Sequence, residues 1–321
     1  MFAVYADAPN PDDPMAALVI GERPDPVVPP VWVRVSVRAA SVNLHALWTL
    51  RGVGIKAEAF PMILGCDAAG VLDDGTEVVV HPVISTDDWR GDETLDPQRS
   101  LLSERHQGTF ADQVIVPARN VVPKPAAMSF AQAACMGTAW LTAYRMLFVK
   151  SGLQPGQTML VQGASGGVST ALIVLGHAAG MRVWVTGRQA DKRAVATRLG
   201  ADQVFESGAR LPERVDAVFE TVGQATWSHS MRSLRPGGVV VVSGATTGDP
   251  TSAELQRLFF LQLRVIGSTM GTRAELADLL SFCEIGHLEP YIGAELPMAS
   301  ADQALRALLE GDAEGKIVLT R

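Results

Sequence analysis

The hydrophobic and polar positions of residues 158–192 follow two different periods. A short apolar run at 159–161 breaks into a glycine-rich stretch, and apolar residues then recur at helical spacing until Gly180. A second strand-like run follows at 182–186. Strand, glycine turn, helix and strand in this order predict the βαβ unit that holds a dinucleotide.

The glycine turn has the residue types that a pyrophosphate requires. Gly163 allows a sharp turn off the strand, because it lacks a side chain that would restrict the backbone. Gly166 and Gly167 let main-chain amides approach the phosphates at a helix N-terminus, where negative charge is favoured. An ordinary tight turn is the alternative. The candidate pyrophosphate-binding residues are Gly163, Ser165, Gly166, Gly167 and Val168.

The end of the second strand favours NADP(H) over NAD(H). NAD-binding proteins usually place an acidic residue about 20 residues beyond the glycines, where it bonds the ribose 2′-hydroxyl. This chain has Gly187 and Arg188 there, followed by Lys192. Two cations can meet a 2′-phosphate, and Arg188 can do so with a forked guanidinium. The alternative is a solvated basic start of a helix.

Strands and helices continue to alternate after this unit. A helix is expected at 191–199, ending at Gly200. Further strands are expected at 216–219, 239–242 and 264–268. Alternation of this kind predicts a doubly wound parallel sheet, with ligands at the carboxyl ends of its strands.

The N-terminal part of the chain reads as β-rich. Short strands are expected at 31–37, 71–72, 77–80 and 114–116, and a helix at 129–134 has Ser129 as its N-cap. The polar stretch between His81 and Gly108 could be a lid, although a surface loop is favoured. The tail returns to helix at 275–284, and its strand at 315–319 could rejoin this first domain.

Bulk composition excludes several classes of function. The chain has 321 residues and a net charge of −7, so nothing suggests nucleic acid as a partner. Its three cysteines are scattered, which argues against a disulfide framework and fits a reducing cytoplasm. No signal-like N-terminus is present, and no apolar run approaches the about 18 residues of a membrane span.

Several short motifs occur along the chain, at 41–43 with 51–52, 64–71, 108–111, 141–144, the glycine turn, 199–201 and 315–316. Together they resemble the medium-chain dehydrogenase/reductase superfamily, and most closely its quinone oxidoreductase branch. The resemblance implies a Rossmann cofactor domain at 136–270 and a β-rich, GroES-like catalytic domain at 1–135 and 271–321. It also implies homodimerisation through the cofactor domain.

The resemblance also bears on zinc. Zinc-dependent members hold a catalytic zinc at three positions that match Asn43, Cys66 and Thr138. Only one of these is a good zinc donor, whereas a catalytic zinc needs three protein ligands. The cysteines of the structural-zinc lobe are absent as well. His45, Cys66 and Asp67 could gather around a metal, but a hydrogen-bonded polar cluster is favoured, so we expect no metal.

Without zinc, the expected reaction is hydride transfer from NADPH to a quinone or a conjugated carbonyl. Such acceptors spread the developing negative charge onto oxygen, so hydrogen-bond donors suffice. An ordinary alcohol would need a Lewis acid. The alternatives are an enoyl or 2-alkenal reductase, a metal-assisted alcohol dehydrogenase, and a non-catalytic NADPH-binding protein.

The candidate catalytic residues lie in the N-terminal part. Asn43 can donate to the substrate oxygen, unless it only caps a turn, and His45 can relay a proton, unless it is structural. In quinone reductases the motif continues with Asp and Tyr, whereas Ala46 and Trp48 stand here, which leaves substrate identity open. The candidates are Asn43, His45, Trp48, Cys66 and Asp67.

Further cofactor contacts follow from the resemblance. Thr142 matches a threonine beside the nicotinamide, and Lys316 matches a lysine near the cofactor, unless it is a surface cation. Tyr144 could contact phosphate or ribose, or pack in the core. The residues that end two expected strands should bracket the nicotinamide ring with main-chain groups. These are Ser243, Gly244, Ser268 and Met270.

Overall fold

The computed structural model describes residues 1–250 and 252–321, and the chain divides into two compact units. Unit 1 comprises Met1–Leu141 and Met270–Arg321, and unit 2 comprises Thr142–Thr269. Unit 1 is therefore built from both ends of the chain. Among the described residues, no helix is both long and apolar enough to cross a membrane.

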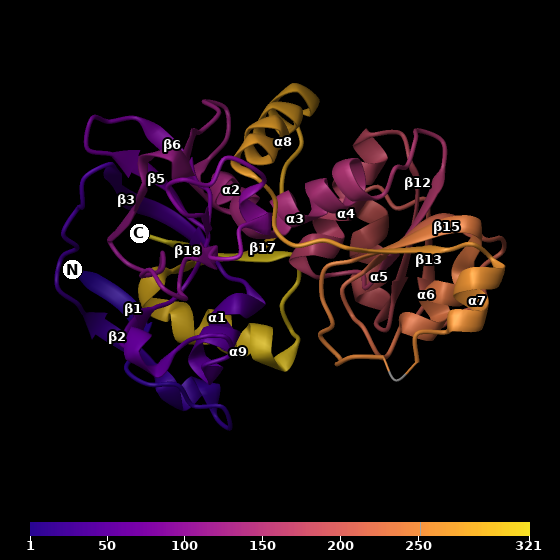
Figure 1. Ribbon diagram of the computed structural model, residues 1–321, viewed down its shortest axis with the longest axis horizontal. Coiled ribbons are helices and arrows are strands. Elements are labelled where there is room, and N and C mark those ends of the chain that lie inside the picture. The colour runs from indigo at the N-terminus through magenta and orange to yellow at the C-terminus, as the bar shows by residue number, and fades with distance from the viewer. Residues whose placement is uncertain (251) are drawn as a thin grey trace. The chain divides into compact units, whose positions relative to one another are not determined.

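Unit 2, in which Figure 1 labels β12, β13 and β15, is organised around a parallel sheet with the strand order β13-β12-β11-β14-β15-β16. Its centre, β11, is fully buried, which explains its continuous apolar sequence. The order reverses between β11 and β14, and this reversal opens a crevice at the carboxyl edge. The strands are β11 Thr158–Gln162, β12 Arg182–Gly187, β13 Gln203–Glu206, β14 Val215–Glu220, β15 Leu234–Val242 and β16 Arg264–Gly267.

Helices connect these parallel strands. α4 contacts β11 and β12, α5 contacts β12 and β13, and α6 contacts β14 and β15. Because such crossovers are right-handed, the helices before and after the reversal of strand order cover opposite faces of the sheet. The helices are α4 Gly167–Ala178, α5 Ala190–Arg198, α6 Trp227–Ser233 and α7 Leu255–Phe260, with η6 at Arg145–Lys150.

The doubly wound parallel sheet predicted from the sequence is confirmed, and only details differ. The hydrophobic pattern did not predict the strand β13, because this strand has only four residues and half of them are exposed. β15 begins at Leu234, five residues before the apolar run at 239–242, because its first residues read as a turn.

Unit 1 is rich in strands. β18, near the C-terminus, pairs antiparallel with β3, so the tail rejoins the first domain as expected. The main sheet has the order β10-β6-β5-β3-β18-β17, with β9 also on β3, and a smaller sheet has the order β2-β1-β4. The strands are β1 Phe2–Ala6, β2 Leu18–Glu22, β3 Trp32–Ser41, β4 Met62–Ile63, β5 Ala69–Leu72, β6 Glu77–Val80, β7 Val83–Ile84, β8 Ser100–Leu101, β9 Gln113–Pro117, β10 Val121–Pro123, β17 Ile292–Pro297 and β18 Lys316–Thr320.

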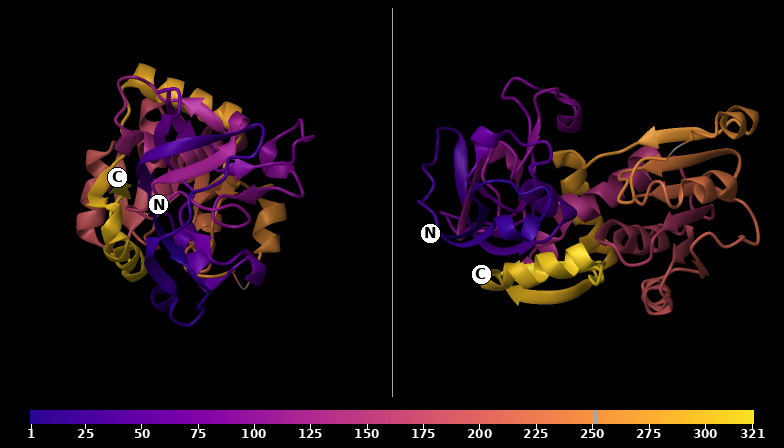
Figure 2. Two further views of the ribbon diagram at one scale, coloured as in Figure 1. Left: turned by 90° about the vertical axis from the view of Figure 1, so that its left-hand side faces the viewer. Right: turned by 90° about the horizontal axis from the view of Figure 1, so that it is seen from below.

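The helices of unit 1 are short except near the C-terminus. Ser129 forms a capping box with Gln132 at the start of α2, as its sequence predicts. The yellow helix α9 lies beside β17 (Figure 2). Neither of these two elements was predicted from the sequence. The helical segments are η1 Pro14–Ala17, α1 Leu44–Arg51, η2 Ala57–Ala59, η3 Glu93–Leu95, η4 Ala118–Asn120, α2 Phe130–Ala134, η5 Met136–Trp140, α8 Arg273–Gly286, η7 Met298–Ser300 and α9 Ala301–Glu310. The helix α3 Leu141–Tyr144 begins at the last residue of this part of unit 1 and continues into unit 2.

The polar stretch between His81 and Gly108 has a defined fold of its own. It contains β7, η3 and β8, and β7 pairs antiparallel with β8. Gly108 ends the segment where a side chain would not fit, because a Cβ there would lie 2.3–2.5 Å from three backbone carbonyl oxygens. The end of this segment is therefore held tightly against residues 63–65.

His81 is a buried histidine that joins two distant parts of unit 1. Its Nε2–H donates to the carbonyl oxygen of Gly271 at 2.9 Å, just before α8. Burial lowers the pKa of His81 to about 4, with help from the charge of Arg273 and against the hydrogen bond to Gly271. The native state therefore keeps this imidazole neutral.

Acid should destabilise the protein through His81. The unfolded state protonates this histidine below about 6.5 and the native state only below about 4. The stabilisation is thus complete above pH 6.5 and is lost as the pH falls to 4, at a cost of about 3 kcal/mol. Urea unfolding at pH 7.0 and 4.5 measures this loss. His81→Gln, which keeps an N–H donor, should flatten the pH dependence, whereas exposed His177→Gln should not; equal pH dependence in all three proteins would contradict the assignment.

Candidate active site

The glycine turn of unit 2 has the geometry of a phosphate cradle. Gly163 adopts a left-handed φ of 92°, as the sequence predicts for a sharp turn off the strand. The following helix α4 has Gly166 as its N-cap and no side-chain cap. A Cβ on Gly166 would meet only the Ser169 hydroxyl, at 3.9 Å. Open space therefore faces the uncapped start of a helix, which is an anion-binding arrangement.

A buried polar network fixes the strand beneath this turn. Gln162, the last residue of β11, donates through Nε2 to the Ser230 hydroxyl at 2.9 Å. Its Oε1 accepts a hydrogen bond from Thr186 on β12, and Ser230 donates to Glu220 on β14 at 2.6 Å. Three neighbouring strand ends are thereby held in register at the edge where the cofactor is expected.

The carboxyl end of β12 has one more cation nearby than the two predicted from the sequence. Arg188 is exposed, whereas Arg193 donates to the carbonyl oxygens of Gly187 and Arg188 at 2.8 and 3.0 Å. Arg193 also lies 3.6 Å from the carboxylate of Glu206 at the end of β13. Arg188, Lys192 and Arg193 thus lie on one short stretch, and Arg193 is paired with the neighbouring acid.

Two hydroxyl groups at the carboxyl edge are buried without partners. Ser243 follows β15 and Ser268 follows β16, and within the described residues neither Oγ atom has a hydrogen-bond partner. Orphaned buried hydroxyls are costly, so a ligand at this edge would satisfy them.

The other expected cofactor contacts lie in both units. Gly244 follows Ser243 directly. Thr142 is buried in α3 at the start of unit 2, whereas Met270 belongs to unit 1 and has a left-handed φ of 51°.

The candidate catalytic residues of unit 1 surround one buried carboxylate, that of Asp67. It accepts hydrogen bonds from the Ser41 hydroxyl at 2.8 Å, from Asn43 Nδ2 at 2.7 Å and from the Thr138 hydroxyl at 2.6 Å. Asp67 is 0 % exposed, so these donors replace the water that its charge would otherwise need. The hydrogen-bonded polar cluster expected from the sequence is present.

Lys316 supplies the positive charge of this cluster. Its ammonium donates to Asn43 Oδ1 at 2.6 Å and to the Val42 carbonyl at 2.8 Å, and it lies 3.9 Å from Asp67. The residue is only 2 % exposed, so its interpretation as a surface cation is wrong. Asn43 occupies the N-cap position of α1, but its side chain makes no capping bond and instead bridges Asp67 and Lys316.

Cys66 and His45 stand at one side of the cluster. The Cys66 sulfur lies 3.7 Å from Asn43 Nδ2 and 3.4 Å from the Thr138 hydroxyl. His45 Nε2 lies 3.2 Å from Glu104 Oε1, a residue that the sequence reading did not select. Burial lowers the pKa of His45, but hydrogen bonding and the charges of Cys66 and Glu104 outweigh it and raise the pKa to about 10.

The other cysteines differ in environment from Cys66. Burial raises the pKa of the Cys135 thiol, and likewise that of Cys283, to about 12. These two thiols are therefore inert at neutral pH.

Trp48, which stands where quinone reductases have tyrosine, is 39 % exposed on α1, and the Arg51 guanidinium lies 5.3 Å from its ring centroid.

A catalytic zinc does not fit these side chains. Cys66 is a good zinc donor, but Asn43 presents its amide nitrogen to the sulfur and its oxygen to Lys316. Thr138 directs its hydroxyl to Asp67. In the part of the chain that the structure describes, no group of three or more His, Cys, Asp or Glu side chains is arranged to hold a metal. Of the three matched positions, Cys66 alone offers a good zinc ligand, whereas a catalytic zinc site needs three protein ligands.

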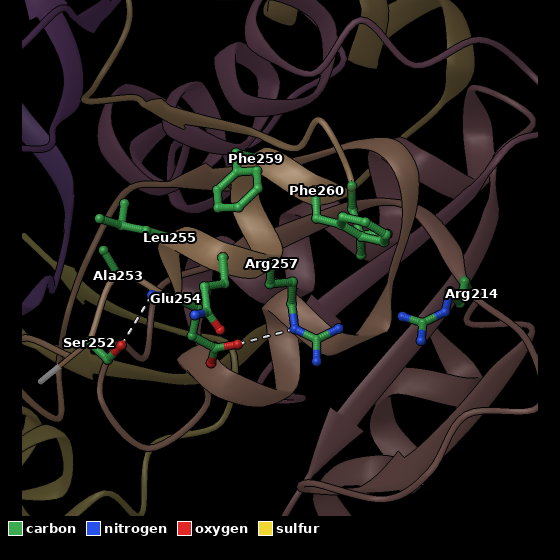
Figure 3. Close-up of a pocket in the computed structure, with 10 residues that line it drawn as sticks. Arg214, Ser252, Ala253, Glu254, Leu255, Arg257, Phe259 and Phe260 are labelled. Carbon is green, nitrogen blue, oxygen red and sulfur yellow. Dashed lines mark hydrogen bonds and ion pairs between the residues drawn. The ribbon is translucent and has the colours of Figure 1, made fainter.

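A separate hollow in unit 2 is lined by α7 (Figure 3). Glu254 and Arg257 form an ion pair of 3.2 Å on this helix, beside Phe259 and Phe260. Arg214 and Leu261 also line the hollow, and these residues precede β14 and β16. That end of the hollow therefore lies at the amino ends of the strands, opposite the glycine turn, so the hollow is not the dinucleotide site.

Comparisons with known proteins agree with this architecture. Residues 29–126 match the family Alcohol dehydrogenase GroES-like domain, and residues 167–284 match Zinc-binding dehydrogenase. A crotonyl-CoA carboxylase/reductase of Cereibacter sphaeroides is 29% identical over 85% of this chain and 76% of its own length. A quinone oxidoreductase of Mus musculus is 26% identical over 89% of this chain and 88% of its own.

A solved structure matches over the full length. The crystal structure of an NAD-dependent alcohol dehydrogenase is 31% identical, with a TM-score of 0.93 and 100% coverage of both chains. This protein thus has the fold of a two-domain dehydrogenase, with a GroES-like and a Rossmann part. The chain belongs to the medium-chain dehydrogenase/reductase superfamily and is similar to its quinone oxidoreductases.

Removing the buried ammonium should destabilise unit 1. Lys316→Met leaves the Asp67 carboxylate without a nearby cation, which should cost about 3–5 kcal/mol of unfolding free energy. Urea unfolding measures this cost, and exposed Lys56→Met is the matched control. Adding Asp67→Asn to Lys316→Met should recover part of the loss, because no buried charge then remains. A loss no larger than that of the control would contradict the role of Lys316.

Proposed function

We propose that this protein is a reductase that transfers hydride from NADPH to a quinone or a conjugated carbonyl without zinc. The observation that carries the proposal is the arrangement around Asn43, whose amide joins Asp67 and Lys316 where zinc-dependent relatives have a ligand. A cluster of hydrogen-bond donors can stabilise an oxygen that gains negative charge, and a conjugated acceptor depends less than an ordinary alcohol on a Lewis acid.

The choice of NADP(H) rests on the cations after β12. Arg188 and Lys192 can pair with a 2′-phosphate, and Arg193 offsets the negative charge of Glu206 beside them. The local balance of positive charge favours the phosphorylated nucleotide.

The reduced nicotinamide, when bound, supplies the hydride, and the chain supplies binding and orientation. Gly163 to Val168 hold the pyrophosphate with main-chain amides at the start of α4. Ser243 and Ser268 offer their unsatisfied hydroxyls at the carboxyl edge, beside the main chain of Gly244. Thr142, Met270 and Lys316 are the remaining proposed contacts. Asn43 and His45 are the proposed donors to the substrate, together with Trp48, Cys66 and Asp67 in the same part of the site.

A second candidate is an enoyl or 2-alkenal reductase. The similarity to a crotonyl-CoA carboxylase/reductase, over 85% of this chain, favours it. The same donors serve both acceptors, because hydride addition to either one places negative charge on oxygen. An alcohol dehydrogenase and a non-catalytic NADPH-binding protein are the weaker alternatives.

We also propose a cytoplasmic homodimer. All three cysteines are free and buried, which fits a reducing compartment. β16 is the last strand of its sheet, and on α7, which precedes it in the chain, Phe259 and Phe260 are 69% and 79% exposed. Such an apolar edge is typical of a surface that pairs. A monomeric mass in sedimentation equilibrium would contradict the dimer.

Charge removal after β12 should change cofactor preference. Arg188→Ala with Lys192→Ala should weaken NADPH binding by about 10- to 100-fold, because charge-assisted hydrogen bonds to the 2′-phosphate are lost, while NADH binding changes little. Titration of nucleotide fluorescence measures both affinities. Exposed Arg198→Ala, later on the same helix, is the control. Equal losses for the two nucleotides would refute the preference.

Turnover itself tests the function. Purified protein should oxidise NADPH with a small quinone, and the absorbance of reduced nicotinamide follows the reaction. A conjugated enal and a simple alcohol with NADP are assayed in parallel to separate the candidates. Activity should remain undiminished after exhaustive chelation. Turnover of the enal alone would favour the second candidate, and binding of NADPH without any turnover would favour the non-catalytic one.

A further inference from the structure

The segment between β8 and Gln107 is fastened to helix α1 at two points. The Thr49 hydroxyl lies 3.2 Å from both the carbonyl oxygen and the hydroxyl of Ser103. One turn earlier on the same helix, His45 Nε2 meets Glu104 Oε1 at 3.2 Å. This part of the polar segment, which reads from sequence as a surface loop or a lid, therefore contributes a carboxylate to the polar cluster of unit 1.

The Glu104 carboxylate is held in place from its other side. Its Oε2 accepts hydrogen bonds from the Leu101 amide at 2.8 Å and from the Ser100 hydroxyl at 3.3 Å. The preceding residue, Ser103, is fully buried and has a left-handed φ of 69°, a conformation that is unfavourable for serine. The contacts with Thr49 hold this conformation, so the carboxylate reaches His45 from a rigid support.

Most donors of the cluster already have an acceptor. Asn43 Nδ2 donates to Asp67, and the Thr138 hydroxyl donates to Asp67 as well. The Lys316 ammonium donates to Asn43 and to the Val42 carbonyl. His45 Nδ1 is buried, and within residues 1–250 and 252–321 it has no hydrogen-bond partner. Unlike the Thr138 hydroxyl, the protonated ring can therefore donate through Nδ1 without breaking an existing bond.

From this geometry we infer that Glu104 is a positioning residue, which accepts the Nε2 proton of His45 and so directs a protonated Nδ1 to the substrate as the proton donor of the reduction. The inference rests on the proposed reductase function and adds to it the proton donor and a role for the polar segment. Glu104 itself does not touch the substrate.

The reaction balances with one hydride and one proton. The reduced nicotinamide, when bound, would supply the hydride, and an acceptor that takes it at a ring carbon or the β-carbon would move the electron pair of its π bond to oxygen. The His45 Nδ1–H bond breaks, its proton goes to that oxygen, and the imidazole is left neutral with Nε2–H still bonded to Glu104. Solvent then restores the proton, so that NADPH and H⁺ are consumed for each acceptor reduced.

The charges around His45 determine how the activity depends on pH. Glu104 and Cys66 face the ring and favour its protonated form, and together they outweigh burial so that the pKa of His45 rises to about 10. Asp67 and Lys316, joined through Asn43, are the further charged pair of the cluster. Loss of the Glu104 charge removes a stabilising anion, so the pKa of His45 should fall.

The test compares Glu104→Gln with Glu93→Gln, which lies on the same segment outside the contact with His45. Glu104→Gln should lower kcat for quinone by about tenfold or more, the scale of one acid–base contribution. The KM for NADPH should stay unchanged, and the alkaline limb of kcat/KM should move to lower pH by about one unit or more. Glu93→Gln should show neither effect.

Two further measurements separate the possible failures. Adding Glu104→Gln to His45→Gln should lower kcat no further than His45→Gln alone, because the carboxylate acts through the imidazole. The NMR titration of His45 in Glu104→Gln should show its lowered pKa even without substrate. If wild type reduces neither quinone nor enal, the proposed function fails. If wild type is active and Glu104→Gln matches Glu93→Gln in kcat and pH profile, the positioning role of Glu104 is refuted.

Discussion

The buried charge of Asp67 is the constraint on which the candidate site of unit 1 depends. A carboxylate that is 0 % exposed requires donors and a cation in place of water. Ser41 and Asn43 between β3 and α1, Thr138 in η5 and Lys316 on β18 meet this requirement from three separate parts of the chain. The same requirement brings the C-terminal strand next to β3, and so the electrostatics of the site and the pairing of the sheet support each other.

Unit 2 differs from this cluster, because polar groups at the carboxyl edge of its sheet have no hydrogen-bond partner among the described residues. Its strands are held in register by Gln162 and Glu220, whose side chains are fully bonded within the network. Above them, the start of α4 has no side-chain cap, and the hydroxyls of Ser243 and Ser268 have no partner among the described residues. A preorganised nucleotide site needs this combination, in which a rigid hydrogen-bonded network supports polar groups that have no partner within the protein.

The two kinds of site differ in how charge is balanced. After β12, cations lie near the surface, where Arg188 is exposed and Arg193 offsets Glu206. Around Asp67 each charge is paired within the protein, so the cluster can present hydrogen bonds without presenting net charge.

The doubly wound sheet, the glycine turn and the return of the tail to the first domain could all be predicted from the amino-acid sequence. These features follow from local periodicity and from residue types, such as the glycine at φ 92°, that suit few backbone conformations. The contact of Glu104 with His45, 59 positions away, and the burial of Lys316 beside Asn43 could not be predicted in this way, because they arise only in the folded chain. A contact between distant residues depends on how strands pair and loops close, and no local pattern records it. The strand β13 escaped for the related reason that four residues at a sheet edge carry too little periodicity to be recognised.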